Sequence, residues 1–383
     1  MKETPILLSP PDMTGKEQMY INDAFEKNFI APVGENIDRF EVEVADYVSS
    51  RYAVAVTSGT AGLHLALIAA NVQAGDIVLC SDFTFTASVN PILYQQAIPV
   101  LVDSEQETWN MDPEQLEQTI KKYSAQNRRP KAVVVTHIYG QLAKMEQIID
   151  ICQNYHILVI EDACEAMGTV HEKLGHAGTI GDLGVYSFNG NKIITTSGGG
   201  MVVTDNEVMA KRINYLSTQA KSNKSYYLHE EIGYNYRMSN ILAGVGRAQL
   251  VSLEDKITSR RRVYEKYQTA FADMKHIQMI PEDPEYVRSN RWLSVVLLSK
   301  VEPKALMDHL KAQNIESRLT WNPMHEQPVF KNLAIDFFYN EARTKPVSEQ
   351  LFAKGLCLPS GSRLSDCEQD RVIAAIQQFL KDE

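Results

Sequence analysis

The sequence predicts an α/β protein with a mostly parallel central sheet, helices on both of its faces, and a smaller α+β domain at the C-terminus. Between about residues 50 and 205, short apolar segments rich in Val and Ile alternate with amphipathic segments. Such alternation is typical of parallel strands joined by crossover helices. After residue 205 it gives way to longer helical patterns with few strands, which indicates a region of different construction.

Five segments are predicted to be strands because they are almost continuously hydrophobic, as strands covered on both faces should be. They are residues 53–56, 77–80, 98–102, 132–136 and 157–160. The amphipathic segments predict helices at residues 61–70, 86–96, 113–123 and 145–154. Asp112 supports the third helix, because Asp is a favourable N-cap and Pro113 fits the first helical turn.

The C-terminal part contains longer helical patterns. Apolar positions at helical spacing predict helices at residues 207–216, 240–267, 305–313 and 370–381, and strands are predicted at 292–298 and around 357–358. A chain of 383 residues is long for one core. We therefore expect a large domain at residues 1–250 and a small domain at 251–383, with the boundary inside a continuous helix.

Composition excludes several classes of protein. A formal net charge of −10 argues against a nucleic-acid binder, and no segment approaches the roughly 18 apolar residues of a membrane span. The five cysteines form no C-x-x-C pair, so we expect no metal site and a reducing compartment. The N-terminus lacks the apolar core of a signal peptide, and we expect a cytoplasmic protein.

Polar residues follow three predicted strands, where ligands of parallel sheets bind. Residues 58–60 (Ser-Gly-Thr) form a small-residue turn before a helix, and backbone amides there attract phosphate; a plain strand–helix connection is the alternative. Asp82 leads into an aromatic stretch at residues 83–85. Asp162 ends the fifth strand, where it suits a pyridinium nitrogen, although a helix cap or a metal or ribose ligand is also open.

Lys192 lies among small and amide residues just before a triple-glycine turn. Most lysines are exposed and inert, but a sheltered, unprotonated amine is a nucleophile toward carbonyl carbons. Ser187 precedes it by a short segment and offers a hydroxyl to the same site. The order of turn, acid and lysine along the chain is more specific than any one of the three signals.

With these residues in this order, the sequence resembles the DegT/DnrJ/EryC1/StrS family of sugar-nucleotide aminotransferases over nearly its whole length. The runs that carry the resemblance are residues 30–35, 233–238, 321–330 and 187–201, the last reading Ser-Phe-Asn-Gly-Asn-Lys-Ile-Ile-Thr-Thr-Ser-Gly-Gly-Gly-Met. Within the family it is most similar to the bacillosamine-pathway transaminases that make UDP-4-amino-4,6-dideoxy-N-acetylglucosamine. Related deoxygenating enzymes have histidine in place of Lys192, so the lysine implies transamination.

The resemblance implies the type I fold of pyridoxal 5'-phosphate (PLP) transferases and assigns a role to each matching position. Lys192 and Asp162 would be catalytic, the first as the Schiff-base lysine and the second as partner of the pyridinium nitrogen. The remaining cofactor contacts would be Thr60, Ala61 and Ser187 at the phosphate, Phe85 on the ring face, Glu165 near the ring hydroxyl, and Asn235 from the neighbouring subunit. The implied assembly is a homodimer with a shared active site.

The implied reaction moves an amino group from L-glutamate to C4 of a UDP-linked 4-keto-6-deoxy-N-acetylhexosamine. A GDP-perosamine or dTDP-amino-sugar type of substrate is the alternative within the family. His325 and Arg318 are candidate substrate contacts, since a guanidinium matches diphosphate oxygens; a core histidine and a surface ion pair are the simpler interpretations. A non-catalytic protein of this fold remains an alternative, whereas the missing G-x-G-x-x-G disfavours a nicotinamide oxidoreductase.

Overall fold

The computed structural model describes residues 4–333 and 335–381. Its largest sheet has the order β1-β9-β8-β5-β4-β2-β3-β14. These strands are β1 (Tyr52–Val56), β2 (Ile77–Ser81), β3 (Ile98–Val102), β4 (Ala132–Thr136), β5 (Leu158–Asp162), β8 (Leu183–Ser187), β9 (Gly200–Thr204) and β14 (Asp336–Phe338). Among the described strands of this sheet, β9 pairs antiparallel with β1 and β8, and the other pairs are parallel, so the mostly parallel sheet is as predicted.

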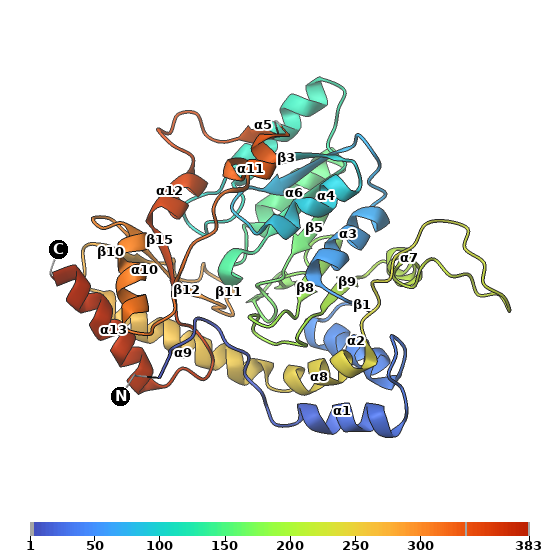
Figure 1. The fold of residues 1–383 in the computed structure, drawn as a ribbon. Coiled ribbons are helices and arrows are strands. Elements are labelled where there is room, and N and C mark those ends of the chain that lie inside the picture. Colours follow the sequence, from blue (N-terminus) through green and yellow to red (C-terminus); the bar gives the residue numbers. More distant parts are fainter. Residues whose placement is uncertain (1–3, 334, 382–383) are drawn as a thin grey trace.

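Helices cover both faces of this sheet (Figure 1). Successive strand residues face opposite cores, as in Leu79 against Cys80 on β2. The core on one face includes residues of α3 (Gly59–Ala69), α4 (Asn90–Tyr94) and α7 (Glu207–Ser217). The core on the other includes residues of α2 (Glu35–Val48), α5 (Pro113–Ala125), α6 (Met145–Tyr155) and α8 (Asn240–Leu250). Burial on both faces explains why the strands lack polar alternation.

A second, four-stranded antiparallel sheet has the order β10-β12-β15-β13. Its strands are β10 (Ile277–Met279), β12 (Ser294–Leu298), β13 (Arg318–Leu319) and β15 (Gly355–Leu358). Residues of α9 (Leu253–Phe271), α10 (Pro303–Ala312) and α13 (Asp366–Lys381) share a core with it. The arrangement confirms the predicted fold class, a parallel-sheet region with a smaller α+β region.

The remaining elements are short connections and edges. They are α1 (Glu17–Glu26), η1 (Thr86–Ser88), η2 (Ile138–Gly140), η3 (Met324–Glu326), α11 (Pro328–Lys331), α12 (Val347–Lys354), and the three-stranded sheet of β6 (Val170–His171), β7 (Gly175–His176) and β11 (Val287–Arg288). Among the described residues, no helix is both long and apolar enough to cross a bilayer.

Two helices predicted as continuous are broken in the structure. The segment 86–96 forms η1 and then α4, because Pro91 in the first turn of α4 has no amide hydrogen with which to continue a preceding helix. The segment 240–267 forms α8 and α9, separated at residues 251–252. The Ser252 hydroxyl donates to the carbonyl of Gln249, a local bond that competes with the helical pattern.

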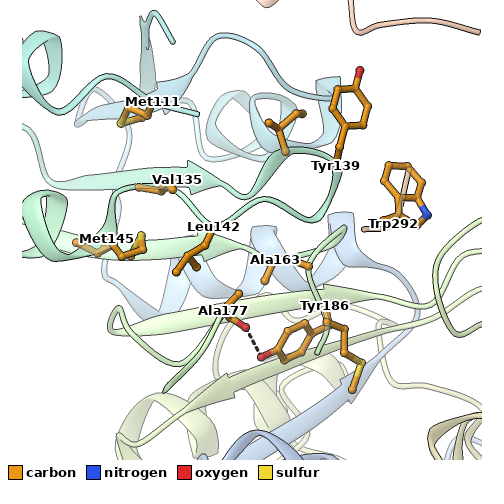
Figure 2. Close-up of a cluster of buried hydrophobic side chains, with 14 of the residues drawn as sticks. Met111, Val135, Tyr139, Leu142, Met145, Ala163, Ala177, Tyr186 and Trp292 are labelled. Atoms are coloured by element: carbon orange, nitrogen blue, oxygen red, sulfur yellow. Dashed lines mark hydrogen bonds between the residues drawn. The ribbon is translucent and has the colours of Figure 1, made fainter. Parts of the chain in front are cut away.

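The division at residue 250 stays a prediction. The break between α8 and α9 lies at this position, but segments from each of the two regions pack against or join the sheet of the other. Ile6, near the N-terminus, forms an isolated bridge with Ile315, and β14 returns to the large sheet beside β3. Figure 2 shows that Trp292 lies in the same apolar cluster as Tyr139 and Tyr186 of the large region. The two regions therefore share core contacts near the candidate site.

Candidate active site

A cavity of about 460 Å³ opens at the carboxyl ends of the parallel strands. It is lined by Ser58, Gly59, Thr60, Thr84, Phe85, Ala87, Thr136, Asp162, Cys164, Glu165, Ser187, Asn189, Asn191, Lys192, Gly198, Gly199, Arg318 and Trp321. The register explains the convergence, since Thr136 and Asp162 are paired at the ends of β4 and β5. The predicted residues Thr60, Phe85, Asp162, Glu165, Ser187, Lys192 and Arg318 are all brought together here.

The turn before α3 is packed tightly against the cavity floor. Ser58 caps the helix by accepting from the amide of Ala61 at 3.0 Å. A Cβ on Gly59 would lie 2.7 Å from Cys164 Sγ and 3.1 Å from Ser187 Cβ, so only glycine fits without displacement. Thr60 lines the cavity and Ala61 does not. The helix N-terminus presents the positive end of its dipole, which favours a phosphate.

Asp162 is a buried carboxylate, 5% exposed, on the cavity wall. Its Oδ2 accepts from the Ser88 hydroxyl at 2.6 Å and its Oδ1 from the amide of Cys164 at 3.2 Å. Among residues 4–333 and 335–381, no lysine, arginine or histidine forms an ion pair with it. A buried carboxylate without a cation is costly, so a site for a cationic ring nitrogen fits this residue.

The neighbouring Glu161 points to the opposite side of β5, as the period of a strand requires. It is fully buried and accepts from the amides of residues 178, 180 and 181 at 2.6–2.8 Å. His137 Nε2 lies 2.8 Å from its Oε2. Glu161 therefore holds a loop, and only Asp162 of the pair faces the cavity.

The amine of Lys192 lies between a carboxylate and an aromatic ring. Its Nζ is 3.4 Å from Glu165 Oε1 and 4.1 Å from the ring centroid of Trp292, and the side chain is 13% exposed. Burial raises the pKa of Glu165 above its usual value, although Lys192 and the Tyr139 amide oppose this rise. The indole of Trp292 is itself fixed by donating to the carbonyl of Asn191 at 2.8 Å. The amine is thus sheltered and held in one place.

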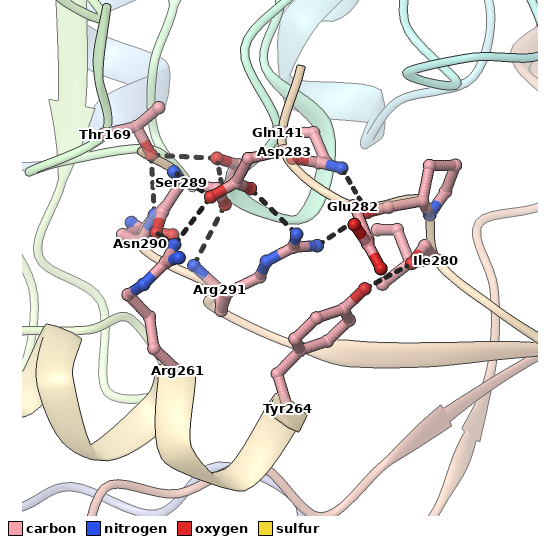
Figure 3. Close-up of polar contacts among 12 residues, drawn as sticks. Gln141, Thr169, Arg261, Tyr264, Ile280, Glu282, Asp283, Ser289, Asn290 and Arg291 are labelled. Carbon is pink, nitrogen blue, oxygen red and sulfur yellow. Dashed lines mark hydrogen bonds and ion pairs between the residues drawn. The ribbon is translucent and has the colours of Figure 1, made fainter. Parts of the chain in front are cut away.

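Asn290 supports both neighbours of Lys192, and it lies in a polar network with Thr169, Ser289 and Asp283 (Figure 3). The amide of Asn290 donates to the carbonyls of Glu165 and Met167 at 2.9 and 3.0 Å, and its oxygen accepts from the Trp292 amide at 2.9 Å. Gly140, at φ +90°, packs so closely that a Cβ would lie 2.0 Å from Asn290 Oδ1. This network fixes the distance between Glu165 and Trp292 across the two regions of the chain.

Phe85 and Arg318 lie toward the open side of the cavity. Phe85 is half exposed and its ring centroid lies 5.2 Å from that of Trp321, so part of this side chain is open to the cavity. Arg318 pairs weakly with Glu316 at 3.5 Å and its side chain is 54% exposed. Such a guanidinium is available to an anionic ligand.

His325 and Asn235 lie outside the cavity. His325 contacts Asp82, with Nδ1 at 2.8 Å from Oδ2 and its amide at 2.9 Å from Oδ1. Asn235 is exposed at the base of the segment between α7 and α8, where it forms a bridge with Thr218, and the middle of this segment extends away from the body of the chain (Figure 1). Within a single chain, neither residue contributes to the cavity wall.

Sequence reasoning missed Ser88, Thr84, Thr136, Trp292 and Trp321. Thr136 was identified only as the end of a strand, and Thr84 and Ser88 follow another strand end, so their placement could have been suspected from the sheet alone. The two tryptophans come from the C-terminal region and reach the site only through its packing. Trp321 opens the run of residues 321–330 that carries the family resemblance, whereas no local pattern marks Trp292 as a site residue.

A mostly parallel sheet with a sheltered lysine, a buried acid and a helix N-terminus at its carboxyl edge defines the class of PLP-dependent transferases. The profile of the DegT/DnrJ/EryC1/StrS aminotransferase family matches residues 11–377. The chain belongs to this family, as the resemblance implied.

Curated relatives and solved structures agree with the family. The chain is 46% identical to EpsN of Bacillus subtilis (strain 168), named for a proposed PLP-dependent aminotransferase activity, over 97% of this chain and 95% of EpsN. It is 35% identical to the GDP-perosamine synthase of Escherichia coli O157:H7 over the full length of both. A DegT DnrJ EryC1 StrS aminotransferase from Brucella abortus matches with a TM-score of 0.87 and 26% identity over 95% of each chain.

The fold is also that of a proposed sugar aminotransferase, Spr1654 from Streptococcus pneumoniae, in its PLP form, at a TM-score of 0.90 and 24% identity over 99% of each chain. The family match, with neighbouring structures in PLP, PMP and ketimine forms, indicates pyridoxal 5'-phosphate as the cofactor. The protein is therefore a sugar aminotransferase of the PLP-dependent kind.

Proposed function

We propose that this protein transfers an amino group from L-glutamate to C4 of a UDP-linked 4-keto-6-deoxy-N-acetylhexosamine. The observation that supports this most is the cavity that unites Lys192, Asp162 and the α3 N-terminus. A second cavity of about 150 Å³ shares Asn191, Arg318 and Trp321 with the first and reaches the N-terminal segment 7–11. Together they offer space for a substrate larger than an amino acid.

The cofactor contacts are proposed from the placement of this chain's residues. Thr60, Ser187 and the α3 N-terminus, with the turn that contains Ala61, would hold the phosphate. Asp162 would pair with the ring nitrogen, Phe85 would cover one ring face, and Glu165 would lie near the ring hydroxyl. PLP supplies an electron sink for the carbon that loses a proton.

Lys192 has two tasks in this proposal. Its Nζ would bind the cofactor covalently and, once released, would carry the proton between the donor α-carbon and the cofactor. A positioned amine of this kind typically contributes about 10²–10⁴-fold to the rate. Glu165 and Trp292, at 3.4 and 4.1 Å from Nζ, would keep the released amine within reach.

A GDP-linked 4-keto sugar is the second candidate substrate. It is favoured by GDP-perosamine synthases of three bacteria, which are 33–35% identical to this chain over at least 97% of its length. Both candidates present a 4-keto sugar and a diphosphate, so the exposed guanidinium of Arg318 suits either. His325, tied to Asp82, would reach substrate only after leaving this partner.

The active assembly would be a homodimer in which the segment between α7 and α8 carries Asn235 to the partner's phosphate site. The exposure of Asn235, at the base of a segment whose middle extends away from its own chain (Figure 1), supports the idea. All five cysteines are free, which suits the reducing cytoplasm that we propose as its location.

Turnover on a panel of nucleotide ketosugars tests the substrate. Purified holoenzyme with L-glutamate is expected to aminate the UDP-linked 4-keto-6-deoxy-N-acetylhexosamine with the highest kcat/KM, measured by mass spectrometry of the product. A higher kcat/KM for the GDP-linked 4-keto sugar would transfer the assignment to the second candidate. Absence of turnover on every 4-keto sugar would overturn the proposed reaction.

A further inference from the structure

Three buried hydroxyl groups form a chain that ends on Asp162. Ser88 Oγ lies 2.6 Å from Asp162 Oδ2, Thr84 Oγ1 lies 2.7 Å from Ser88 Oγ, and Thr136 Oγ1 lies 2.9 Å from Thr84 Oγ1. All four residues are at most 5% exposed. The proposed contacts of the cofactor use none of the three hydroxyls.

The acceptor at one end fixes the direction of the whole chain. A carboxylate oxygen accepts, so Ser88 must donate its single hydroxyl hydrogen to Asp162. Ser88 then accepts from Thr84, and Thr84 in turn accepts from Thr136. Hydrogen bonds aligned in this way polarise one another. The bond from Ser88 to Asp162 is therefore strengthened by the two threonines behind it.

The row of hydroxyl groups that ends on Asp162 joins three separate parts of the large sheet. Thr84 and Ser88 follow β2, Thr136 ends β4, and Asp162 ends β5. The amide of Thr136 also donates to Ser81 Oγ at 3.1 Å, and the amide of Thr84 to the carbonyl of Asp82 at 3.1 Å. Both threonines are thus held by their backbones. The Ser88 hydroxyl that donates to Asp162 is therefore held in place by two threonines whose own positions are fixed.

We infer that Ser88 is a positioning residue, supported by Thr84 and Thr136, that orients the Asp162 carboxylate and keeps a shared proton on the cofactor's ring nitrogen. Donation to Oδ2 stabilises the charged carboxylate. Asp162 then competes less well for the proton that lies between it and the nitrogen. The inference rests on the proposed role of Asp162 as partner of that nitrogen.

A purely structural role for the three hydroxyls would have a different signature. Loss of a buried hydrogen bond would lower thermal stability wherever it lies, but it would leave the protonation of the cofactor unchanged. The decisive observable is therefore the 15N NMR signal of PLP labelled at the ring nitrogen and bound to the protein, since this signal separates protonated from unprotonated pyridine. It requires no turnover.

The experiment compares Ser88→Ala with variants that remove the hydroxyl group one and two hydrogen bonds further from Asp162. Ser88→Ala is expected to shift the proton equilibrium away from the ring nitrogen by roughly ten- to a hundredfold, the size expected for a hydrogen bond to a charged group. Thr84→Val and Thr136→Val are expected to give progressively smaller shifts. Ser88→Thr restores a hydroxyl and is expected to return the signal toward that of the wild type.

Ser294→Ala is the matched control. Ser294 begins β12, is fully buried, and its hydroxyl has no hydrogen-bond partner among the described residues. It is expected to leave the 15N signal unchanged. If Ser88→Ala destabilises the fold too far for NMR, Thr84→Val supplies the same comparison one step further from the cofactor.

The outcomes separate this inference from the proposed role of Asp162. An unchanged 15N signal in Ser88→Ala and Thr84→Val, with a change in Asp162→Asn, would overturn the hydroxyl chain and leave Asp162 in its role. An unprotonated nitrogen in the wild type, or no change in Asp162→Asn, would overturn the role itself. Equal shifts in Ser88→Ala and Ser294→Ala would reduce the effect to a general loss of packing.

Discussion

At the scale of single residues, the site depends on atoms that have almost no freedom to move. Lys192 Nζ lies against Glu165 and Trp292, and each of these neighbours is fixed by further hydrogen bonds. Such preorganisation places the amine without a cost in side-chain entropy at each turnover. Two substitutions test this scale.

The first is Lys192→Ala, which removes the amine that binds the cofactor and moves the proton. Transamination is expected to fall by at least about 10²–10⁴-fold, measured as kcat with glutamate and the best ketosugar. The fold is expected to survive, because the Lys192 side chain lines the cavity and Trp292 keeps its own hydrogen bond to the Asn191 carbonyl. Lys304→Ala, at an exposed lysine of α10, serves as the control. Substantial turnover by Lys192→Ala would refute the role of the residue.

The second is Gly59→Ala, which places a methyl group 2.7 Å from Cys164 Sγ and 3.1 Å from Ser187 Cβ. Displacing these residues should disturb the phosphate site and weaken PLP retention by about tenfold, since overpacking of this kind costs about 1–3 kcal/mol. Equilibrium dialysis of PLP measures it. Adding Cys164→Ala is expected to recover part of the loss, and Gly190→Ala, where no atom lies within 4 Å, should have no effect.

At the scale of elements, the pair of His325 in η3 and Asp82 after β2 joins the C-terminal region to the large sheet. Burial lowers the pKa of His325, but the hydrogen bond and charge of Asp82, with Glu349 and Glu326, outweigh it, so the pKa lies above its ordinary value of 6.5. A group whose folded pKa is raised stabilises the fold fully below the unfolded pKa. This contribution is lost as pH rises through the folded pKa.

The difference in unfolding free energy between the wild type and His325→Asn should therefore be largest below pH 6.5 and shrink above it. Asn offers Asp82 an amide donor that does not titrate. The unfolding free energy of the His325→Asn variant should therefore change little over this range of pH. His325→Ala leaves the buried carboxylate unpaired and is expected to cost roughly 3 kcal/mol. Urea titrations at a series of pH values measure this. A difference independent of pH would contradict the assignment.

The same scale shows where sequence patterns suffice and where they fail. The strands from β1 to β5 were predicted within two residues because each is apolar on both faces and bounded by turns. The break of residues 240–267 into α8 and α9 was missed, since helical periodicity continues across Ser252. β14 was also missed, because only its position beside β3 makes it a strand.

In the candidate site, too, some residues can be predicted from local sequence patterns and others cannot. Residues at strand ends, such as Asp162 and Ser187, were predictable because parallel strands deliver their last residues to one edge. Trp292 was not, because it reaches Lys192 from another region of the chain. Arg318 was named because a guanidinium matches diphosphate oxygens. Asn235 was named only through the family resemblance, and it lies apart from the cavity of its own chain.

At the scale of the whole molecule, the proposed dimer makes each site depend on two chains. Asn235→Ala is expected to weaken PLP retention without altering the cavity of its own chain. Inactive Lys192→Ala and impaired Asn235→Ala proteins, unfolded together and refolded as hybrids, should regain activity. Each hybrid then has one site with an intact Lys192 from one chain and an intact Asn235 from the other.

Refolded samples of each variant alone provide the control, and they should remain at their starting activity. Size-exclusion chromatography with light scattering would establish that the hybrids are dimers. A monomer with full activity, or hybrids that never exceed the mean of the two variants, would contradict a shared site.

Borohydride reduction of the holoenzyme tests the central claim most directly. Reduction fixes the bond between PLP and the amine that holds it, and peptide mass spectrometry then identifies the labelled residue. The expected result is one pyridoxyl group per chain, attached to the peptide that contains Lys192. A label on any other lysine, with Lys192 unmodified, would contradict the account.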